Sequence, residues 1–352
     1  MRKLALAFIL TFITVVGGAV LFGVIMWVRI TEPYRGYSDS ELYVQVPSGA
    51  GTSEIGRALV DAGIVKDQLS FRAALYWTGA SRTLKAGEYR FDRPMSAVAA
   101  VEKMARGDVY ARRITFPEGH TIREMAQIYE MQGFGRARDF VDAARDVSLI
   151  ADLDPKAPDL EGYLYPETYA LPRGSKPSVL IQMMVARFKA VFDGELRRLT
   201  EARDMSVREA VTLASLVEKE TAKPDERPMV AAVYRNRLKI GMGMQADPTV
   251  VYALQKAGRY DGNIRHDDLQ IDSPYNTYRY SGLPPGPIAS PGKPSLEAAV
   301  TPADVPYLYF VSRNDGSHVF STTLDEHNRN VQRYQVAYFR DQRRQDAQKP
   351  RQ

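Results

Sequence analysis

The N-terminal stretch Leu4–Val28 contains no charged residue, and it limits what the chain can fold into more than any other feature. At ~1.5 Å per residue, a helix of this length crosses a hydrocarbon layer of ~30 Å. Arg2 and Lys3 precede it, so this basic flank is expected to stay in the cytoplasm while the bulk of the chain lies outside. The stretch predicts a single transmembrane helix. A cleavable signal peptide is the alternative, although its apolar region is usually ~7 to 15 residues long.

The composition of the chain excludes several classes of function. Its 352 residues, 45% hydrophobic and 25% charged, are typical of a folded protein with two or three domains. There is no cysteine, which excludes disulfides, thiolate catalysis and cysteine-bound metal. The net charge of +5 suits an anionic polymer or a membrane surface. We expect no nucleic-acid binding, because no basic stripe is interleaved with aromatic residues, and no metal, because no H-E-x-x-H spacing occurs.

Strands and helices predicted after residue 31 are mixed irregularly, which indicates an α+β fold. We expect four parts: residues 1–30 as the cytoplasmic N-terminus and transmembrane helix, 31–112 as a linker and small β-α module, 113–340 as a mixed α+β domain, and 341–352 as a charged tail. The larger domain is therefore the expected location of any chemistry.

The small module begins with Val44–Ser53 (V-Q-V-P-S-G-A-G-T-S), which predicts a strand, a Pro-Gly turn and the start of an amphipathic helix. Leu84–Phe91 then predicts a second strand, and Ser96–Arg106 predicts a helix that ends at Gly107. This order resembles a LysM-like module, a small fold associated with glycans that contain N-acetylglucosamine. A packing or spacer module without a sugar site is the alternative.

A short apolar helix in the larger domain ends in two glutamates. Ser206 and Glu209 form an S-x-x-E capping box that predicts a helix starting at residue 207, and Pro224 stops it. At ~100° per residue, Glu220 lies on the flank of the apolar stripe and Glu218 is turned further away. A carboxyl group against an apolar surface keeps its proton near neutral pH. The periodicity favours Glu220 as a catalytic acid, with Glu218 as the alternative. The non-catalytic alternative is that the glutamate is an ordinary solvated charge at the end of an exposed helix.

Two later loops carry candidate ligand-binding residues. Gln245 has no capping role in its loop and is available to hydrogen-bond a sugar. Tyr275 and Asn276 lie in Ser273–Pro302, which is rich in proline and glycine. A long ordered loop of this kind is usually functional.

Several phrases, in this order, are similar to those of the MltG (YceG-like) endolytic murein transglycosylases. They are L-E-G-Y-L-Y-P-E-T-Y (160–169), L-A-S-L-V-E-K-E-T-A (213–222), Q-A-D-P-T-V (245–250), Y-N-T-Y (275–278), G-L-P-P-G-P-I (282–288) and Y-L-Y-F-V (307–311). With the N-terminal span, this resemblance covers nearly the whole chain. It implies a single-pass anchor in the cell inner membrane, a LysM-like module and a periplasmic α+β catalytic domain.

The resemblance implies a lytic transglycosylase. Such an enzyme cuts the β-1,4 bond between N-acetylmuramic acid and N-acetylglucosamine in nascent glycan, leaves a 1,6-anhydro end and thereby terminates elongation. It needs one carboxyl group rather than the pair of an ordinary glycosidase. The family's catalytic glutamate corresponds to Glu220, because the hydroxyl residue Thr221 follows it. Gln245, Tyr275 and Asn276 match positions expected along the substrate cleft, and no cofactor is implied.

The expected partners are peptidoglycan glycan strands, the inner membrane and, as candidates, peptidoglycan synthases of the elongation or division machinery. The alternative function is a membrane-anchored glycan-binding scaffold for cell-wall synthases without catalytic turnover. The ends left on un-crosslinked glycan strands distinguish the two, because only the transglycosylase makes 1,6-anhydro ends.

Overall fold

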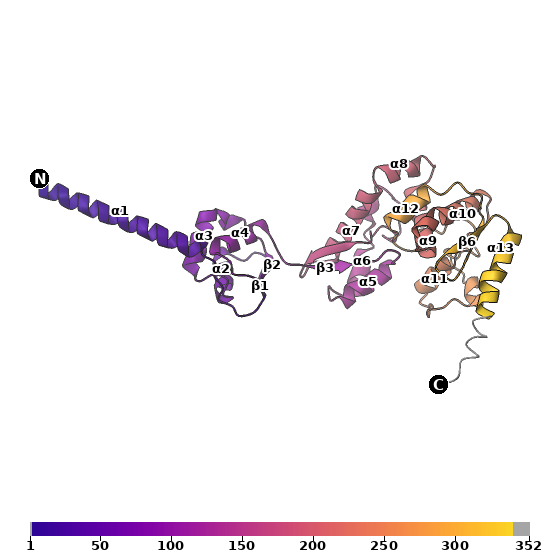
Figure 1. Ribbon diagram of the computed structural model, residues 1–352, viewed down its shortest axis with the longest axis horizontal. Helices are drawn as coiled ribbons and strands as arrows, with labels where there is room; N and C mark the ends of the chain where they lie inside the picture. The colour runs from indigo at the N-terminus through magenta and orange to yellow at the C-terminus, as the bar shows by residue number, and fades with distance from the viewer. Residues whose placement is uncertain (1, 341–352) are drawn as a thin grey trace, which may run out of the picture. The chain divides into compact units, whose positions relative to one another are not determined.

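The computed structural model describes residues 2–340, which form two compact units (Figure 1). The first unit comprises the chain up to Arg112 together with Ala170–Gly174, and the second comprises the rest of the described chain. The predicted charged tail, 341–352, lies outside the described residues. Helices are combined with two-stranded sheets, so the prediction of a mixed α+β fold is confirmed.

Helix α1, Arg2–Thr31, contains the apolar stretch at the N-terminus. Its segment Phe8–Thr31 is long and apolar enough to cross a membrane, as the sequence predicts. Large apolar side chains are exposed along it, including Phe12 and Phe22. Near its end, the ring of Trp27 packs edge-on against that of Trp77 with 4.5 Å between centroids. Helix α1 thus has the all-round apolar surface that suits a lipid environment.

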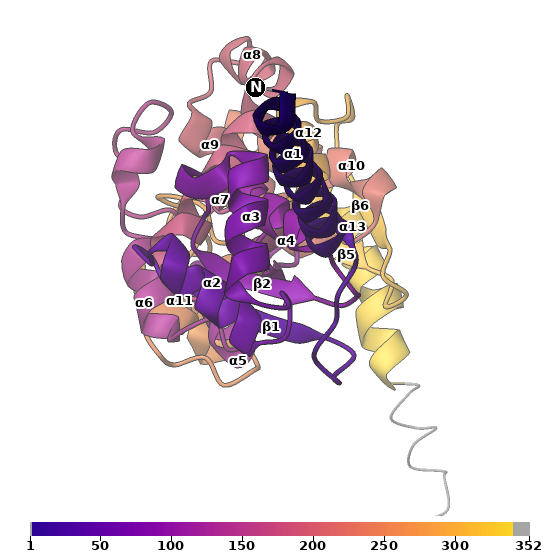
Figure 2. The ribbon, with the colours of Figure 1, turned by 90° about the vertical axis from the view of Figure 1, so that its left-hand side faces the viewer.

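The first unit has the order strand, helix, helix, strand, helix. Its elements are β1 (Leu42–Val46), α2 (Thr52–Asp61), α3 (Gln68–Thr78), β2 (Gly87–Phe91) and α4 (Ala97–Arg106). The two strands pair antiparallel, with Leu42 opposite Phe91 and Val46 opposite Gly87. Figure 2 shows α2 and α3 beside this strand pair. The strands and helices predicted for this region are present, but helix α3 was not predicted.

The second unit is mostly helical. Its elements are α5 (Ile122–Met131), α6 (Ala137–Ala143), α7 (Pro177–Phe192), α8 (Glu195–Glu201), α9 (Val207–Glu220), α10 (Arg227–Lys239), α11 (Asp247–Lys256), α12 (Lys293–Val300), β5 (Tyr309–Ser312), β6 (His318–Ser321) and α13 (Leu324–Val331). Strands β3 (Ala111–Thr115) and β4 (Thr168–Pro172) form a separate two-stranded sheet. The alternating segments 307–312 and 318–322 around Asn314-Asp315-Gly316 predict a hairpin. Strands β5 and β6 form it, with Ser312 opposite His318.

Two sequence predictions for this unit are wrong in detail. The apolar spacing of residues 178–200 predicts a single amphipathic helix, but the structure has α7 and α8 separated at Asp193 and Gly194. Gly194 has φ of +81°, a conformation that favours glycine and breaks the helix. The mixed-charge segment 137–150 likewise predicts one helix, but α6 ends at Ala143 and only a short 3₁₀ turn follows at Val147–Ile150.

Helix α9 is the central helix of the second unit. Every residue from Ala210 to Val217 is buried, and the helix packs against α10 and α12. It begins at Val207 after the predicted capping box, in which Ser206 and Glu209 bond each other's backbone N–H groups. The hydroxyl of Ser215 accepts a hydrogen bond from the N–H of Ile288 at 3.1 Å, which ties the proline-rich loop to the helix. The last residue of α9, Glu220, is therefore held by a rigid element.

Candidate active site

Glu220 is the last residue of α9 and is only partly exposed. The hydroxyl of Tyr234, on α10, donates a hydrogen bond to its Oε1 atom at 2.6 Å. Burial raises the pKa of Glu220 to about 7, although the Tyr234 hydrogen bond and the electrostatic influence of His318 and Arg237 oppose the rise. The negative charge of Asp247 adds to it. A carboxyl group with this pKa can give up a proton and take one back near neutral pH.

The chain turns sharply after Glu220. Thr221 has extended backbone (φ −140°, ψ 133°) and is buried. Its hydroxyl donates to Oε2 of Glu226 at 3.2 Å and accepts from the N–H of Lys223 at 3.1 Å. The hydroxyl residue that follows the acid thus fixes the end of the helix.

Glu226 and His318 join this turn to the β5–β6 hairpin. Glu226 accepts the backbone N–H of His318 at 2.9 Å, and its Oε2 lies 2.7 Å from Nδ1 of the same histidine. Burial alone raises the pKa of Glu226, but these hydrogen bonds outweigh it and the pKa is lowered. Glu226 is therefore an ionised anchor for His318, which places a histidine within electrostatic reach of Glu220.

A second carboxylate, Asp247, lies in the same electrostatic neighbourhood. Its Oδ1 accepts a hydrogen bond from the exposed Tyr278 at 2.6 Å. Its place before Pro248 predicts that Asp247 is the N-cap of a helix. In the structure Asp247 is instead the first residue of α11, and its described side-chain bond is to Tyr278. Burial and the Asp247 bond raise the pKa of Tyr278, so this hydroxyl stays protonated and remains a donor.

Glu218, the alternative acid, has a different environment. Its side chain is 7% exposed, and its Oε1 lies 3.6 Å from Nη2 of Arg227, which is also buried. Its Oε2 accepts the N–H of Gly292, at the start of α12, at 2.9 Å. Glu218 therefore holds α9, α10 and α12 together, and it contacts none of the groups that surround Glu220 among the described residues.

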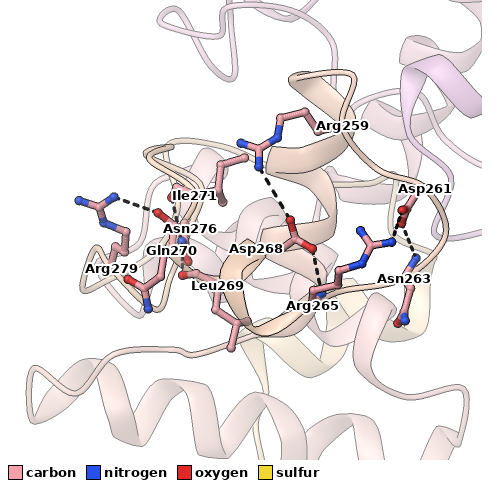
Figure 3. Close-up of polar contacts among 10 residues, drawn as sticks. All are labelled: Arg259, Asp261, Asn263, Arg265, Asp268, Leu269, Gln270, Ile271, Asn276 and Arg279. Carbon is pink, nitrogen blue, oxygen red and sulfur yellow. Dashed lines mark hydrogen bonds and ion pairs between the residues drawn. The ribbon is translucent and has the colours of Figure 1, made fainter.

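Asn276 is fully buried, with 0% of its surface exposed. Its amide group donates to the carbonyls of Leu269 and Ile271, each at 2.9 Å (Figure 3). Its Oδ1 accepts the N–H of Tyr278 at 3.0 Å. These bonds leave no surface for a ligand. The predicted ligand residue Asn276 instead orders the loop that carries Tyr278.

The other two predicted ligand residues lie in different surroundings. Gln245 is exposed and has φ of +49°, a left-handed conformation that is uncommon outside glycine and that recurs at functional sites. Tyr275 is half-buried and packs on Tyr252, with 4.8 Å between ring centroids. Burial and the charges of Asp159 and Glu161 raise the pKa of Tyr275 to about 12. Tyr275 therefore belongs to the neighbourhood of Glu161.

Glu161 lines a separate cavity of about 240 Å³. It accepts the N–H of Ile122 at 3.0 Å and the hydroxyl of Tyr252 at 3.2 Å. Burial raises its pKa to about 8. Arg123 and Lys256 also line this cavity.

Sequence reasoning missed Tyr234, Arg237 and Tyr278 as neighbours of the acid. Tyr278 belongs to the same Y-N-T-Y phrase as Tyr275, so the phrase pointed to the right loop. Nothing in the sequence pattern distinguishes Tyr234 from an ordinary core residue of α10. Among the described residues, no group of three or more His, Asp or Glu side chains could hold a metal ion.

Comparison with known proteins gives consistent matches. The model of the YceG-like family matches residues 44–333. The endolytic murein transglycosylase of Bacillus subtilis (strain 168) is 33% identical over 339 residues, covering 91% of each chain. That of Streptococcus pneumoniae serotype 2 (strain D39 / NCTC 7466) is 31% identical, covering 85% of this chain and 59% of that protein.

A solved structure agrees with these matches. The crystal structure of the yceG-like protein lmo1499 from Listeria monocytogenes has a TM-score of 0.56 and 32% sequence identity to this chain. The match covers 83% of this chain and 99% of the Listeria chain. The agreement in sequence over most of the chain, together with this shared fold, shows that the protein belongs to the YceG-like family.

Proposed function

We propose that this protein is an endolytic peptidoglycan lytic transglycosylase in which Glu220 is the single catalytic acid and base. One observation carries this assignment: Glu220 is the carboxyl group at the end of α9 whose pKa is raised to about 7 and whose Oε1 is held by Tyr234 at 2.6 Å. Two relatives in the family are named endolytic murein transglycosylases, which supports the reaction class.

The reaction needs one carboxyl group in two successive roles. Protonated Glu220 gives its proton to the oxygen of the β-1,4 bond, and the bond from that oxygen to C1 of N-acetylmuramic acid breaks. The resulting carboxylate removes the proton from the C6 hydroxyl of the same sugar, while O6 attacks C1 and closes the 1,6-anhydro ring. Because the nucleophile is tethered to C1, no water and no second base are required.

The neighbours of Glu220 support these roles. Tyr234 has a pKa raised well above its usual value by burial and by the charge of Glu220, so it remains a donor throughout. Its bond to Oε1 orients the carboxyl group and leaves Oε2 for the substrate. Asp247 and Tyr278 form a second polar pair for sugar hydroxyls.

The predicted ligand residues have different proposed roles. Exposed Gln245 binds the glycan directly. Tyr275 contributes a ring face that contacts the glycan further along its length, next to the Glu161 cavity. Asn276 acts indirectly by positioning Tyr278.

The first unit anchors the enzyme and guides the glycan in this proposal. Helix α1 spans the inner membrane with its N-terminus in the cytoplasm, which places the catalytic unit in the periplasm. The strand, helix, helix, strand order of β1 to β2 is suited to a LysM-like glycan-binding module. Cleavage of nascent strands close to the membrane ends their elongation, so peptidoglycan synthases are the expected partners.

The products formed from un-crosslinked glycan strands test the function. The purified full-length protein in detergent is incubated with the strands, and the new ends are identified by mass spectrometry. The proposal expects 1,6-anhydromuramyl ends. Reducing ends would identify a hydrolase, and no new ends would identify the glycan-binding scaffold, a function that the names of the relatives do not favour.

A further inference from the structure

Three cationic side chains line a cavity of about 240 Å³ that is separate from both carboxyl sites. Arg203 follows α8, and Arg235 and Lys239 lie on α10. The segment Pro302–Val305 forms another wall, and its Asp304 is the only acidic residue among those lining the cavity. The cavity is therefore strongly basic.

The two arginines of the cavity are not paired with an acidic residue, as several other arginines of this protein are. The buried Nε of Arg203 has no hydrogen-bond partner, and across residues 2–340 neither Arg203 nor Arg235 forms an ion pair. By contrast, Arg208 makes two hydrogen bonds to Asp154, at 2.7 and 2.8 Å. Both side chains are only partly exposed and have no ionic partner among the described residues, so an anion bound between them would be stabilising.

The electrostatic interactions within the cavity also favour a bound anion. Burial lowers the pKa of Arg235, and the positive charge of Arg203 lowers it further. The two guanidinium groups therefore repel each other across the cavity. An anion between them would replace this repulsion with two attractions.

The surrounding backbone holds the cavity walls in place. Asp204 has φ of +54°, and this left-handed residue turns the chain directly after Arg203. Asn236, next to Arg235, donates to the carbonyls of Val305 at 2.8 Å and Tyr307 at 3.0 Å. These bonds fix α10 to the opposite wall, so the cavity is a built feature of the fold.

We propose that Arg203, Arg235 and Lys239 form a binding site for an oxyanion, either a carboxylate or a phosphoryl group. The planar guanidinium presents two parallel N–H groups that match two oxygens of either anion. The site itself does not depend on the proposed function. The further assignment of the oxyanion to a carboxylate on the peptide part of peptidoglycan does rest on the proposed function. Helix α10 would then bind the substrate at this site and would also orient Glu220 through Tyr234.

Thermal unfolding of the full-length protein in detergent, with chloride exchanged for acetate or inorganic phosphate at constant ionic strength, tests the site. We expect a saturable rise in melting temperature for wild type. Arg203→Gln and Arg235→Gln should weaken the apparent affinity at least tenfold. In chloride, neither variant should have a lower melting temperature than wild type. Each substitution removes the repulsion between Arg203 and Arg235, and no described side-chain hydrogen bond is lost. Arg197→Gln is the matched control, since Arg197 is exposed and paired with Asp193 and Glu201.

The same titration identifies the source of the oxyanion. Binding of acetate and of a short peptide with a free carboxylate, but not of its amide, would assign the site to peptide carboxylates, whereas binding of phosphate alone would assign it to a phosphoryl ligand. No saturable shift in wild type, or equal shifts in wild type and both variants, would overturn the site. The same titration is run with Glu220→Gln, which should bind the anion as wild type does even though it lacks the proposed catalytic acid. Failure of the anion site is thereby distinguished from failure of the proposed catalytic role.

Discussion

Tyr234 on α10 donates its hydroxyl hydrogen to Oε1 of Glu220, the terminal residue of α9, across 2.6 Å. This bond joins two packed helices at the one point where α9 leaves the core. It favours the ionised form of Glu220, whereas burial favours the protonated form, and the balance is a pKa of about 7. A group poised in this way can act first as an acid and then as a base.

Removing the Tyr234 hydroxyl should shift the pH dependence of the reaction. The hydrogen bond lowers the pKa of Glu220, so Tyr234→Phe should raise that pKa above about 7. Because the first step needs protonated Glu220, the alkaline limb of the rate profile should move to higher pH. The initial rate of anhydro-product formation across the pH range measures this. Tyr280→Phe is the control, since its exposed hydroxyl bonds only Asp272 among the described residues, and an unmoved limb in Tyr234→Phe would contradict the balance described above.

Stability should fall with rising pH because of Glu161. Its pKa is raised from 4.5 to about 8 in the folded protein, so the folded state holds a proton that the unfolded state has lost. The contribution to stability is complete below the unfolded pKa and is lost as the pH rises through the folded pKa, with ~1.4 kcal/mol for each pKa unit of difference. Glu161→Gln should therefore flatten the decline in the free energy of unfolding between about pH 5 and about pH 8.

Urea unfolding at the two pH values measures this effect. Glu201→Gln, on the exposed surface of α8, provides the comparison and should retain the wild-type decline. Identical pH dependence in wild type and Glu161→Gln would show that the buried carboxyl group does not carry the shift.

Asn276→Ala should destabilise the loop that positions Tyr278. The substitution leaves the part-buried carbonyl of Leu269 and the buried carbonyl of Ile271 without their donor, a loss of about 1 to 3 kcal/mol in the free energy of unfolding. Activity should fall with it, since the N–H of Tyr278 also bonds Asn276. Denaturant unfolding and turnover are measured together, with exposed Asn263→Ala, in the same region of the fold (Figure 3), as the control. Lost activity at unchanged stability would indicate a direct contact with the glycan instead.

The helix that carries the acid could be predicted from sequence because its signals are local. The capping box of Ser206 and Glu209 specifies where α9 begins. Similar local signals bound α3, where Asp67 caps the helix and Gly79 ends it. The break between α7 and α8 has a local signal in Asp193-Gly194, but the apolar pattern continues across it from Phe192 to Leu196, both buried, and favours a single helix.

The neighbours of Glu220 could be predicted less well because they depend on tertiary contacts. Tyr275 and Tyr278 are three residues apart in one phrase, and both carry a ring and a hydroxyl. Their different positions follow from the path of the loop, which Asn276 fixes through carbonyls five and seven residues earlier in the chain. The choice between Glu220 and Glu218 likewise depends on the partners Tyr234 and Arg227, which lie on another helix.

The rate of 1,6-anhydro end formation by Glu220→Gln, compared with Glu218→Gln, is the most direct test of the central claim. Both variants are assayed as full-length protein on un-crosslinked glycan strands, with melting temperatures recorded to show that each is folded. Loss of the general acid should reduce the rate by about 10²- to 10⁴-fold in Glu220→Gln. Glu218→Gln should melt at a lower temperature, because its bonds to Arg227 and Gly292 are weakened, yet keep most of its activity. An active Glu220→Gln together with a folded but inactive Glu218→Gln would contradict the assignment.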